Sequence, residues 1–320
     1  MRLLIVRLSS MGDVIHALPL ARNARRAGAA IGWVIERAFA GLLAGNTDCD
    51  AIFVADTRGW RARPLAAATL REVRNLRRRL RAFAPDGTLE VQGLWKSALI
   101  ARAAGAPVIG FAAPERRESG SAIFCDVRVT PSTRARHIVE RNLALLSPLG
   151  IPPLELSPDA RYLGAAPHPA ADEFLAAAPP GFVLFHPGAA RPEKTWEESR
   201  FAALARGLLR ERGLPPVISW GPGDEDRVRR LRALLPEASV APLLDFPGLA
   251  RVSAASRLFV AGDTGPLHLA DALGVPTLAL FGPTDPARNG PHRDKRGIVT
   301  AMHSVSEQTV LGRALERVEI

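Results

Sequence analysis

The stretch 260–286, which reads VAGDTGPLHLADALGVPTLALFGPTDP, constrains the fold more than any other part of the 320-residue chain. It predicts a strand that ends near Val260, a tight turn over 262–265, a helix that opens at Pro266, and a second strand over 277–281. A strand, a helix and a second strand in this order form a parallel pair, because the helix carries the chain back to the edge where the first strand began. The segment therefore predicts an α/β fold built on parallel strands.

The turn inside this segment favours an anionic ligand. Gly265 lets the backbone approach a ligand closely, and a helix start presents unpaired N–H groups with a partial positive charge. Phosphate is the natural guest at such a place. His268, in the first turn, is either a phosphate donor or a cap of the helix. Asp263 repels phosphate and suits the hydroxyls of a sugar attached to it.

Strand and helix patterns alternate on both sides of a Pro- and Gly-rich segment, 147–180, that holds eight prolines. We expect this segment to link two domains, 1–160 and 161–320. No internal repeat is visible. Ligands of parallel sheets bind beyond the carboxyl ends of the strands, where neighbouring turns converge. In the second domain the turns bring together Lys194, Asp224 or Glu225, Asp263, Thr264 and His268.

The positive charge of the chain is concentrated in its first half. Residues 1–160 hold 23 Lys and Arg against 14 Asp and Glu, and residues 161–320 hold 19 against 18, within a total of +10. The segment 58–81 has nine arginines and one acid. We interpret 71–81 as a helix with a solvated basic face, and 58–63 as a loop that holds anionic groups through guanidinium forks. The first domain therefore faces an acidic partner.

Several classes of protein are disfavoured. Nucleic acid is not the expected partner, because no helix-turn-helix, RNP or zinc pattern accompanies the charge. Cys49 and Cys125 lie far apart without a metal-ligand pattern, which predicts neither a metal site nor a disulfide. The apolar run 3–6 is too short for a signal peptide, and no run approaches the roughly 20 apolar residues of a membrane span. A cytoplasmic protein is expected. The GxxxxGK[ST] pattern of P-loop ATPases is missing from the sequence.

Asp13 follows the first predicted strand, 3–8, and stands where a helix begins. An Asp at this position is commonly a helix cap. The residues alone give no reason to prefer a reacting carboxylate.

A set of segments, in order along nearly the whole chain, resembles the ADP-heptose:lipopolysaccharide heptosyltransferases, which are inverting glycosyltransferases of the GT-B superfamily. The matching segments are RLSSMGDVIH (7–16), VQGLWKS (91–97), HIVERN (137–142), HPG (186–188), KTW (194–196), WGP (220–222), DTGPLH (263–268) and FGPTDP (281–286). SSMGDV and QGLWKS are most similar to the type I enzymes, which add the first heptose to Kdo on lipid A. An acceptor of the type II enzymes, or another nucleotide-sugar donor, is the alternative, and a non-catalytic anion- or nucleic-acid-binding protein is the alternative from another class.

The resemblance implies a GT-B fold, with two Rossmann-like domains whose parallel sheets face each other across a cleft, and a donor site in the second domain. It makes Asp13 the general base of the transfer. Lys194 and the N–H groups of Thr264 and Gly265 would hold the pyrophosphate of ADP-heptose in place of a metal ion. Asp263 would hold the heptose hydroxyls, and Asp224 or Glu225 the ribose. No metal or other cofactor is expected.

The resemblance also implies an acceptor site in the first domain, where Kdo-lipid A would bind. Arg61, Lys96 and Arg117 match family positions near that site. Arg58 and Arg63 are further candidates for acceptor binding because of their positive charge. A basic surface of this kind also attracts anionic headgroups. We expect a protein at the inner face of the cytoplasmic membrane of a Gram-negative bacterium. The last helix, 304–319, is a candidate to pack back on the first domain.

Overall fold

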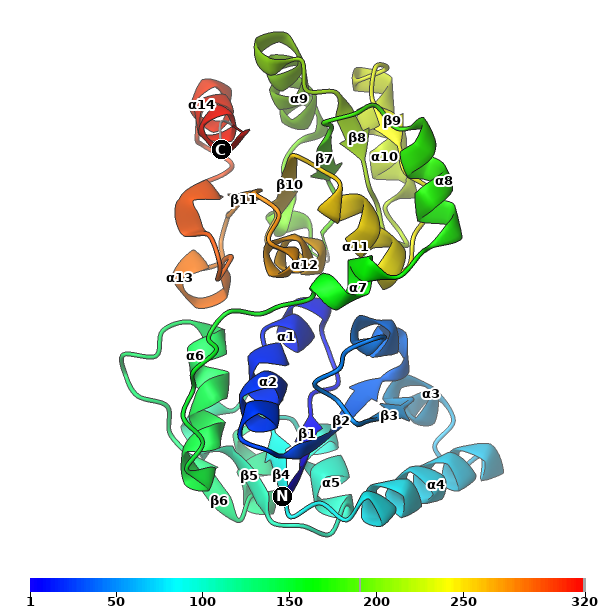
Figure 1. Ribbon diagram of the computed structural model, residues 1–320, viewed down its shortest axis with the longest axis vertical. Coiled ribbons are helices and arrows are strands. Elements are labelled where there is room, and N and C mark those ends of the chain that lie inside the picture. The colour runs from blue at the N-terminus through cyan, green and yellow to red at the C-terminus, as the bar shows by residue number, and fades with distance from the viewer. Residues whose placement is uncertain (190, 319–320) are drawn as a thin grey trace. The chain divides into compact units, whose positions relative to one another are not determined.

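A computed structural model describes residues 1–189 and 191–318. The chain divides into two compact units, Met1–Pro158 and a second that begins at Asp159. Each unit is an α/β domain with one six-stranded sheet in which all neighbouring strands run parallel (Figure 1). The parallel sheets predicted from the strand and helix alternation are therefore confirmed.

The first unit contains the sheet β3-β2-β1-β4-β5-β6. Its strands are β1 (Arg2–Val6), β2 (Ala30–Glu36), β3 (Ala51–Ala55), β4 (Gly87–Glu90), β5 (Val108–Phe111) and β6 (Val127–Val129). Its α-helices are α1 (Met11–Ile15), α2 (Leu18–Arg26), α3 (Thr57–Ala62), α4 (Ala67–Phe83), α5 (Trp95–Ala103) and α6 (Ile138–Leu143). Short 3-10 helices are η1 (Arg37–Leu43), η2 (Ala113–Glu115), η3 (Ser119–Phe124) and η4 (Ala144–Leu149).

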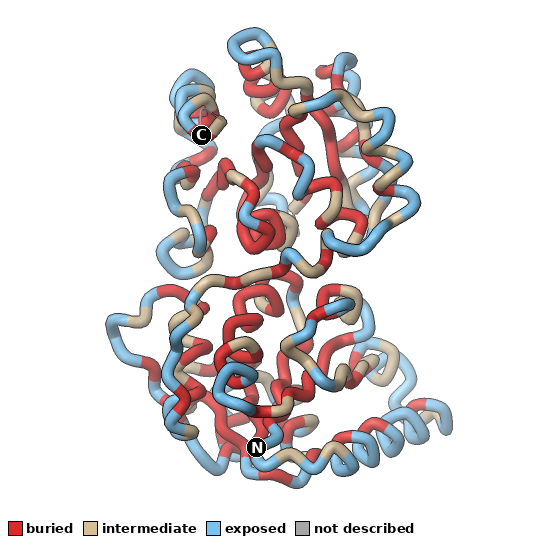
Figure 2. Tube along the Cα trace, in the orientation of Figure 1, coloured by how far each residue is buried: buried red, intermediate tan, exposed pale blue. Residues whose placement is uncertain are grey.

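The central strands of this unit are buried because helices cover both faces of the sheet. Leu3 to Val6 are fully buried, as expected for a central parallel strand, and Figure 2 shows buried residues along these central strands. On one face α4 and α5 contact each other, and Leu76, Leu80, Ala101 and Ala104 enter the same core cluster. On α2, which contacts β2 and α6, apolar residues are buried as well.

The second unit contains the sheet β12-β11-β10-β7-β8-β9. Its strands are β7 (Val183–His186), β8 (Pro216–Ile218), β9 (Ser239–Val240), β10 (Leu258–Gly262), β11 (Thr277–Leu280) and β12 (Ile298–Val299). Its α-helices are α7 (Arg161–Ala165), α8 (Pro169–Ala177), α9 (Glu198–Arg212), α10 (Glu225–Leu234), α11 (Phe246–Ala254), α12 (Gly265–Leu273), α13 (Pro286–Asn289) and α14 (Glu307–Val318). The 3-10 helices are η5 (Pro192–Lys194) and η6 (Lys295–Gly297).

Both sheets have the same topology. Numbered from its own first strand, each has the order 3-2-1-4-5-6, in which the strand order reverses between the first and the fourth strand. Ligands of doubly wound sheets bind at this switch point, beyond the carboxyl ends of the strands. In the first unit the switch point lies between β1 and β4, and in the second between β7 and β10.

The core of the second unit is closed by aromatic side chains and by the last helix. Trp196 and Phe201 are fully buried in an edge-to-face pair with ring centroids 5.1 Å apart. Each such burial stabilises the fold by about 1.5–3 kcal/mol. The helix α14 contacts α9 and β11, and its Val310 and Ala314 are buried in this core. Val310 and Ala314 of α14 therefore belong to the core of the second unit, and the packing of this helix on the first domain stays a prediction. Of the predicted range, Glu319 lies outside the described residues.

Two segments differ from the sequence prediction. Residues 58–63, expected as a loop, lie mostly in the short helix α3, whose start is capped by the Asp56 carboxylate accepting from Gly59 N at 2.9 Å. The Pro-rich segment is not merely a linker, because it contains α7 and α8, which pack against α11. Pro169 opens α8 at a position where a helix needs no N–H donor.

Candidate active site

The predicted helix start after β10 is confirmed. Thr264 precedes the first residue of α12, and Gly265 and Pro266 open the helix. The hydroxyl of Thr264 is buried and has no hydrogen-bond partner among the described residues. The N–H groups of a first helical turn also lack partners inside the helix. Together they offer donors and a partial positive charge to a phosphate group.

Lys194, Asp263 and His268 form one buried cluster beside this helix start. Lys194 Nζ lies 2.5 Å from Asp263 Oδ2, and His268 Nε2 lies 3.4 Å from Asp263 Oδ1. A Cβ atom on Gly262 would stand 2.5 Å from the carbonyl oxygen of Lys194, so only glycine allows the η5 turn to approach the end of β10 this closely. The structure thus brings Lys194, from the turn after β7, together with Asp263 and His268, from the turn and helix start after β10.

Asp263 is a carboxylate in this cluster. Burial alone raises the pKa of Asp263, but hydrogen bonds from His268 and Lys194 outweigh it and hold that pKa well below its usual range. The resemblance assigned Lys194 to the pyrophosphate and Asp263 to sugar hydroxyls, whereas here the two residues bind each other. A phosphate that binds Lys194 therefore competes with Asp263 for the ammonium group.

Asp224 and Glu225 occupy different surroundings. The Asp224 carboxylate accepts from Gly221 N at 3.0 Å, and a Cβ atom on Gly188 would lie 2.1 Å from Asp224 Oδ2. Asp224 is therefore packed against the loop that follows β7. Burial raises its pKa, although the Gly221 N–H opposes this. Glu225 is the first residue of α10 and is exposed. Of this acidic pair, Asp224 is the one in contact with a loop at the switch point.

Asp13 lies in the third position of α1, beyond the carboxyl end of β1. Its Oδ2 accepts hydrogen bonds from Ser10 N at 3.0 Å and Ser10 Oγ at 2.8 Å, and its Oδ1 lies 2.5 Å from Arg7 Nη2. Arg7 is buried and also donates to the carbonyl of Val91 at 2.7 Å. The Asp13 side chain keeps 41% exposure. It is thus fixed in orientation and still accessible to a substrate hydroxyl. The residue before α1 is Ser10, so Asp13 supports the helix start without being its N-cap.

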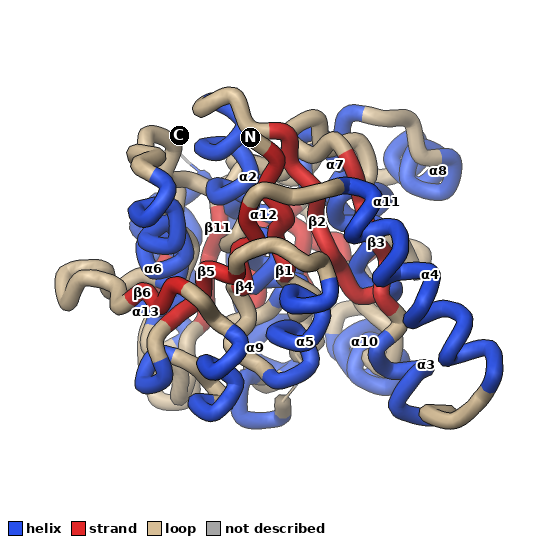
Figure 3. Tube along the Cα trace, turned by 90° about the horizontal axis from the view of Figure 1, so that it is seen from below, coloured by secondary structure: helices blue, strands red, loops and turns tan. Residues whose placement is uncertain are grey.

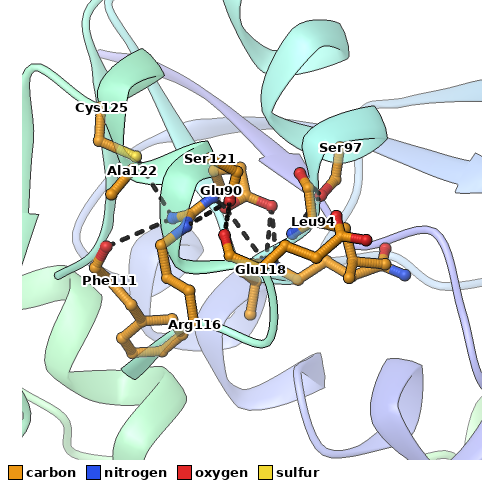
Figure 4. A network of polar contacts seen from close by, with 12 residues as sticks. Glu90, Leu94, Ser97, Phe111, Arg116, Glu118, Ser121, Ala122 and Cys125 are labelled. Atoms are coloured by element: carbon orange, nitrogen blue, oxygen red, sulfur yellow. Dashed lines mark hydrogen bonds and ion pairs between the residues drawn. The ribbon is translucent and has the colours of Figure 1, made fainter. Parts of the chain in front are cut away.

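A fully buried ion pair holds the turn that follows β4 (Figure 4). Glu90 Oε2 lies 2.5 Å from Arg116 Nη2, and both side chains have 0% exposure. The Glu90 carboxylate also accepts from Gln92 N at 3.1 Å and Gly93 N at 3.0 Å. Arg116 Nε donates to Ser121 Oγ at 2.8 Å. This network clamps the β4–α5 turn to the segment that carries the next residue, Arg117.

Lys96 and Arg117 stand on the two segments joined by this network. The Glu118 carboxylate accepts from Trp95 N at 2.6 Å and so caps the first turn of α5. Lys96 Nζ, on that turn, lies 3.4 Å from Thr57 Oγ1, and Thr57 in turn donates to Glu36 at the end of β2. Arg117 is exposed. Three elements of the first unit, α3, α5 and the η2–η3 segment, therefore meet around Lys96.

The arginines of α3 and Arg63, which directly follows this helix, are exposed to solvent. Arg58, Arg61 and Arg63 are all outside the core, and none pairs with a carboxylate among the residues that the structure describes. The guanidinium of Arg58 lies 5.9 Å from the centre of the Phe39 ring. Because Thr57 opens α3 and contacts Lys96, these arginines extend the same positive surface. Whether they bind an acceptor stays a prediction.

Over residues 1–189 and 191–318, no group of three or more His, Cys, Asp and Glu side chains is arranged to hold a metal ion. Both cysteines are free thiols. Burial raises the pKa of the Cys49 thiol to about 12, which disfavours the thiolate form. In the described part of the chain, no helix has the length and apolar character needed to cross a membrane.

Sequence reasoning missed the supporting residues Arg7, Glu90 and Arg116. Arg7 follows four buried apolar residues of β1 and precedes the buried Leu8. Glu90 ends a strand in which every residue is buried. A lone charge inside or directly after an apolar strand needs a partner, and that signal marks Arg7 and Glu90. Nothing local identifies Arg116, which lies in a polar segment.

The comparisons with known proteins agree with this arrangement. Residues 73–316 match Glycosyltransferase family 9 (heptosyltransferase). The chain is 37% identical over 296 residues to lipopolysaccharide heptosyltransferase 1 of Pseudomonas aeruginosa, an alignment that covers 91% of the chain and 81% of that relative. It is 32% identical over 298 residues to the Escherichia coli K12 protein of the same name, with 91% and 90% covered.

The fold is similar to that of solved heptosyltransferases. E. coli heptosyltransferase WaaC with ADP matches with a TM-score of 0.83 and 28% identity over 99% of the chain and 100% of that structure. E. coli ADP-heptose LPS heptosyltransferase II matches with a TM-score of 0.79 and 20% identity over 100% and 99%, a likeness of fold alone. The predicted GT-B class with two Rossmann-like sheets is confirmed.

Proposed function

The chain belongs to glycosyltransferase family 9, the heptosyltransferases, and from this premise we propose that it transfers heptose from ADP-heptose to the Kdo of Kdo-lipid A, with inversion at the anomeric carbon. The identity of 37% over 91% of the chain to a relative named lipopolysaccharide heptosyltransferase 1 carries the proposal. A structure of E. coli WaaC with ADP-2-deoxy-2-fluoro heptose, 28% identical to this chain, supports an ADP-sugar as the donor.

Asp13 is the general base of the proposed reaction. A carboxylate oxygen of Asp13 takes the proton of the acceptor hydroxyl. At the same time the hydroxyl oxygen of the acceptor bonds to the anomeric carbon. The bond from this carbon to the phosphate oxygen breaks, and ADP leaves with the electron pair. A positioned base contributes about 10²–10⁴ to a rate. The ion pair with Arg7 and the hydrogen bonds from Ser10 support this role, because they fix the carboxylate without burying it.

In this proposal, hydrogen-bond donors of the protein stabilise the negative charge on the departing ADP. Lys194, the hydroxyl of Thr264 and the first N–H groups of α12 bind the pyrophosphate, and His268 is a further donor. Asp263, released from Lys194, accepts from heptose hydroxyls, and Asp224 accepts from the ribose. Fixed donors of this kind stabilise a leaving anion in the transition state. The reaction then needs no metal, and a chelator leaves its rate unchanged.

The acceptor site lies on the basic surface of the first unit. Lys96, Arg117 and the arginines of α3 offer ammonium and guanidinium groups to the carboxylates of Kdo and the phosphates of lipid A. Because such an acceptor is held in a bilayer, the enzyme works at the cytoplasmic membrane of a Gram-negative bacterium, bound to its inner face. The net positive charge of the first half supports this location.

The test is the release of ADP from ADP-heptose by the purified protein with Kdo-lipid A as acceptor, in the presence of a chelator. We expect ADP release that requires both substrates and is lost in Asp13→Asn. No release, or equal release by the variant, contradicts the proposal. Release with a heptosylated acceptor in place of Kdo-lipid A identifies the type II reaction, and a panel of other nucleotide sugars tests the donor.

A further inference from the structure

The surface of α4 carries a row of arginines that the proposed reaction does not use. Arg71, Arg74, Arg78 and Arg81 follow one another at spacings of three, four and three residues, so they share one side of the helix. Thr69, Leu76 and Leu80 are the buried residues of α4 and define its opposite side. We call the four arginines the α4 arginine face. They are all exposed.

The charge of the α4 arginine face is not compensated within the first unit. None of its four arginines pairs with a carboxylate within the described part of the chain. The nearest acid in sequence, Glu72, accepts from Trp60 Nε1 at 2.9 Å. A shallow hollow of about 610 Å³ is lined by Arg71, Glu72, Arg74, Asn75 and Arg78. Like charges one helical turn apart repel each other, and the binding of an anionic partner would reduce this repulsion.

Large apolar side chains are exposed on and beside this face. On the α3–α4 segment, Leu65 is 88% exposed, Leu70 43% and Val73 41%. On the neighbouring helix α5, Trp95 is 43% exposed and Leu99 53%. Because Trp95 and Leu99 are four residues apart, they also share one side of their helix.

The outer sides of α4 and α5 face the same way, and Trp95 lies at the edge of α5 nearest η3, where its ring meets Phe124 edge to face with centroids 5.8 Å apart. The buried sides of α4 and α5 enter one core cluster on one face of the sheet, so the outer sides of both helices point away from that face. Figures 1 and 3 show α3, α4 and the connection between them at the outer margin of the first unit, beyond β3. The result is a surface that combines arginine, tryptophan and leucine around a projecting helix. Tryptophan is enriched where proteins meet the bilayer interface, and arginine is attracted to its anionic lipids.

We propose that the outer side of α4 and α5 is the surface that docks on an anionic phospholipid bilayer, with the α4 arginine face on the headgroups and Leu65, Leu70, Trp95 and Leu99 at the interface. The inference rests on the membrane location included in the proposed function. A bilayer fits better than nucleic acid, because exposed apolar side chains flank the charge, and because Phe83, the aromatic residue of α4, packs against Phe53 instead of being available to stack on a base. The apolar residues supply contact area, and the arginines supply selectivity for anionic lipid.

The experiment measures binding of the full chain to vesicles of phosphatidylcholine with about one third phosphatidylglycerol, by co-sedimentation. Arg74→Gln with Arg78→Gln removes two charges and keeps good helix formers. We expect roughly 25-fold weaker binding, since each basic residue near an anionic surface is worth about fivefold. The matched control, Arg210→Gln with Arg229→Gln on α9 and α10, removes the same charge from exposed helical positions of the second unit and leaves binding within about twofold.

A second variant separates the apolar contribution. Leu70→Gln with Leu99→Gln should weaken vesicle binding several-fold without changing its dependence on salt, whereas the arginine variant should flatten that dependence. Wild-type binding in the arginine variant overturns the proposal, and so does an equal loss in the control variant. Loss of duplex DNA binding by the arginine variant while vesicle binding stays intact assigns the face to nucleic acid and also overturns it.

A deacylated, water-soluble Kdo acceptor keeps this inference distinct from the proposed reaction. The arginine variant should release ADP with that acceptor at the wild-type rate, because the α4 arginine face lies outside the reacting residues. If vesicles bind and no ADP is released, the reaction proposal fails and the docking surface stands. If ADP is released but the arginine variant binds vesicles normally, the docking inference fails alone.

Discussion

Arg7 Nη2 lies 2.5 Å from Asp13 Oδ1, in an ion pair whose arginine is 8% exposed and whose carboxylate is 41% exposed. The partner that supplies the charge is buried and anchored to the backbone of Val91, and the carboxylate is the accessible member. This asymmetry suits a positioned base. The buried Arg7 guanidinium fixes the orientation of the Asp13 carboxylate, and the exposed side of the carboxylate stays open to substrate. It also links the ends of β1 and β4, the two strands at the switch point.

Asp13→Asn should abolish transfer and leave donor binding intact. An amide keeps the shape of the side chain but cannot take the acceptor proton. We expect kcat to fall by about 10²–10⁴ in ADP-release assays. Calorimetry with ADP should give a Kd within about twofold of wild type. A variant that retains more than about a tenth of wild-type activity would remove Asp13 from the reaction.

Arg7→Gln should lower kcat and change KM little, because Arg7 acts only through Asp13. A loss of roughly tenfold is expected for a carboxylate that loses its orientation. The decisive measurement is the double variant with Asp13→Asn. If the two residues act as one unit, the double variant is no slower than Asp13→Asn alone. Independent, additive losses would show that Arg7 has a separate role.

Lys194→Ala should weaken ADP binding and also destabilise the fold. It removes a phosphate donor and leaves Asp263 buried without its cation, which costs about 3–5 kcal/mol when one partner of a buried pair is lost. The double variant Lys194→Ala with Asp263→Ala should recover most of the stability in urea unfolding and none of the affinity. Recovery of affinity would show that Lys194 serves only to neutralise Asp263.

The protein should lose stability on acidification through His186. Burial lowers the pKa of His186 from 6.5 to about 4. A base with a depressed pKa binds its proton more readily in the unfolded chain, so its contribution is complete above pH 6.5 and is lost as the pH falls toward 4. The loss reaches about 3 kcal/mol. In denaturant unfolding at several pH values, His186→Gln should flatten this slope, and the exposed-site control His303→Gln should retain it.

Glu90→Gln should be among the most destabilising single substitutions in the first unit. It leaves the fully buried Arg116 without a counter-charge, at an expected cost of about 3–5 kcal/mol. The matched control is Asp126→Asn, which removes the carboxylate of the half-exposed pair with Arg102 and should cost no more than about 1 kcal/mol from that pair. Urea unfolding of both variants tests the contrast. Equal effects would mean that the buried network contributes no more than a surface pair.

Much of the architecture could be predicted because local sequence patterns determine it. The strand, turn and helix over 258–273 follow from an apolar run, a Gly-containing turn and a proline that suits a first helical turn. The helix α3 was missed because six residues are too few for a periodic pattern, and only the Asp56 cap marks its start. The helix α8 was missed because the eight prolines of 147–180 were interpreted as the mark of a linker, although Pro169 at a helix start is favourable.

The candidate site was predictable as a set of side chains but not as a set of partners. Polar residues after parallel strands must gather at one edge of a sheet, which correctly placed Lys194 and Asp263 together. That they pair with each other depends on the close approach of the η5 turn to Gly262, and this approach depends on packing between residues 68 positions apart or more. The buried pair of Glu90 and Arg116 is a long-range contact of the same kind, and no local pattern reports it.

The two sheets share one strand order, although the sequence of one half shows no trace of the other. One strand order therefore forms from two dissimilar sets of residues, and the segments after the strands are what distinguish the two units. If the proposed function holds, a change of sugar donor would need substitutions only in the segments after β7, β8 and β10. The codons of the first half of the gene could then stay unchanged.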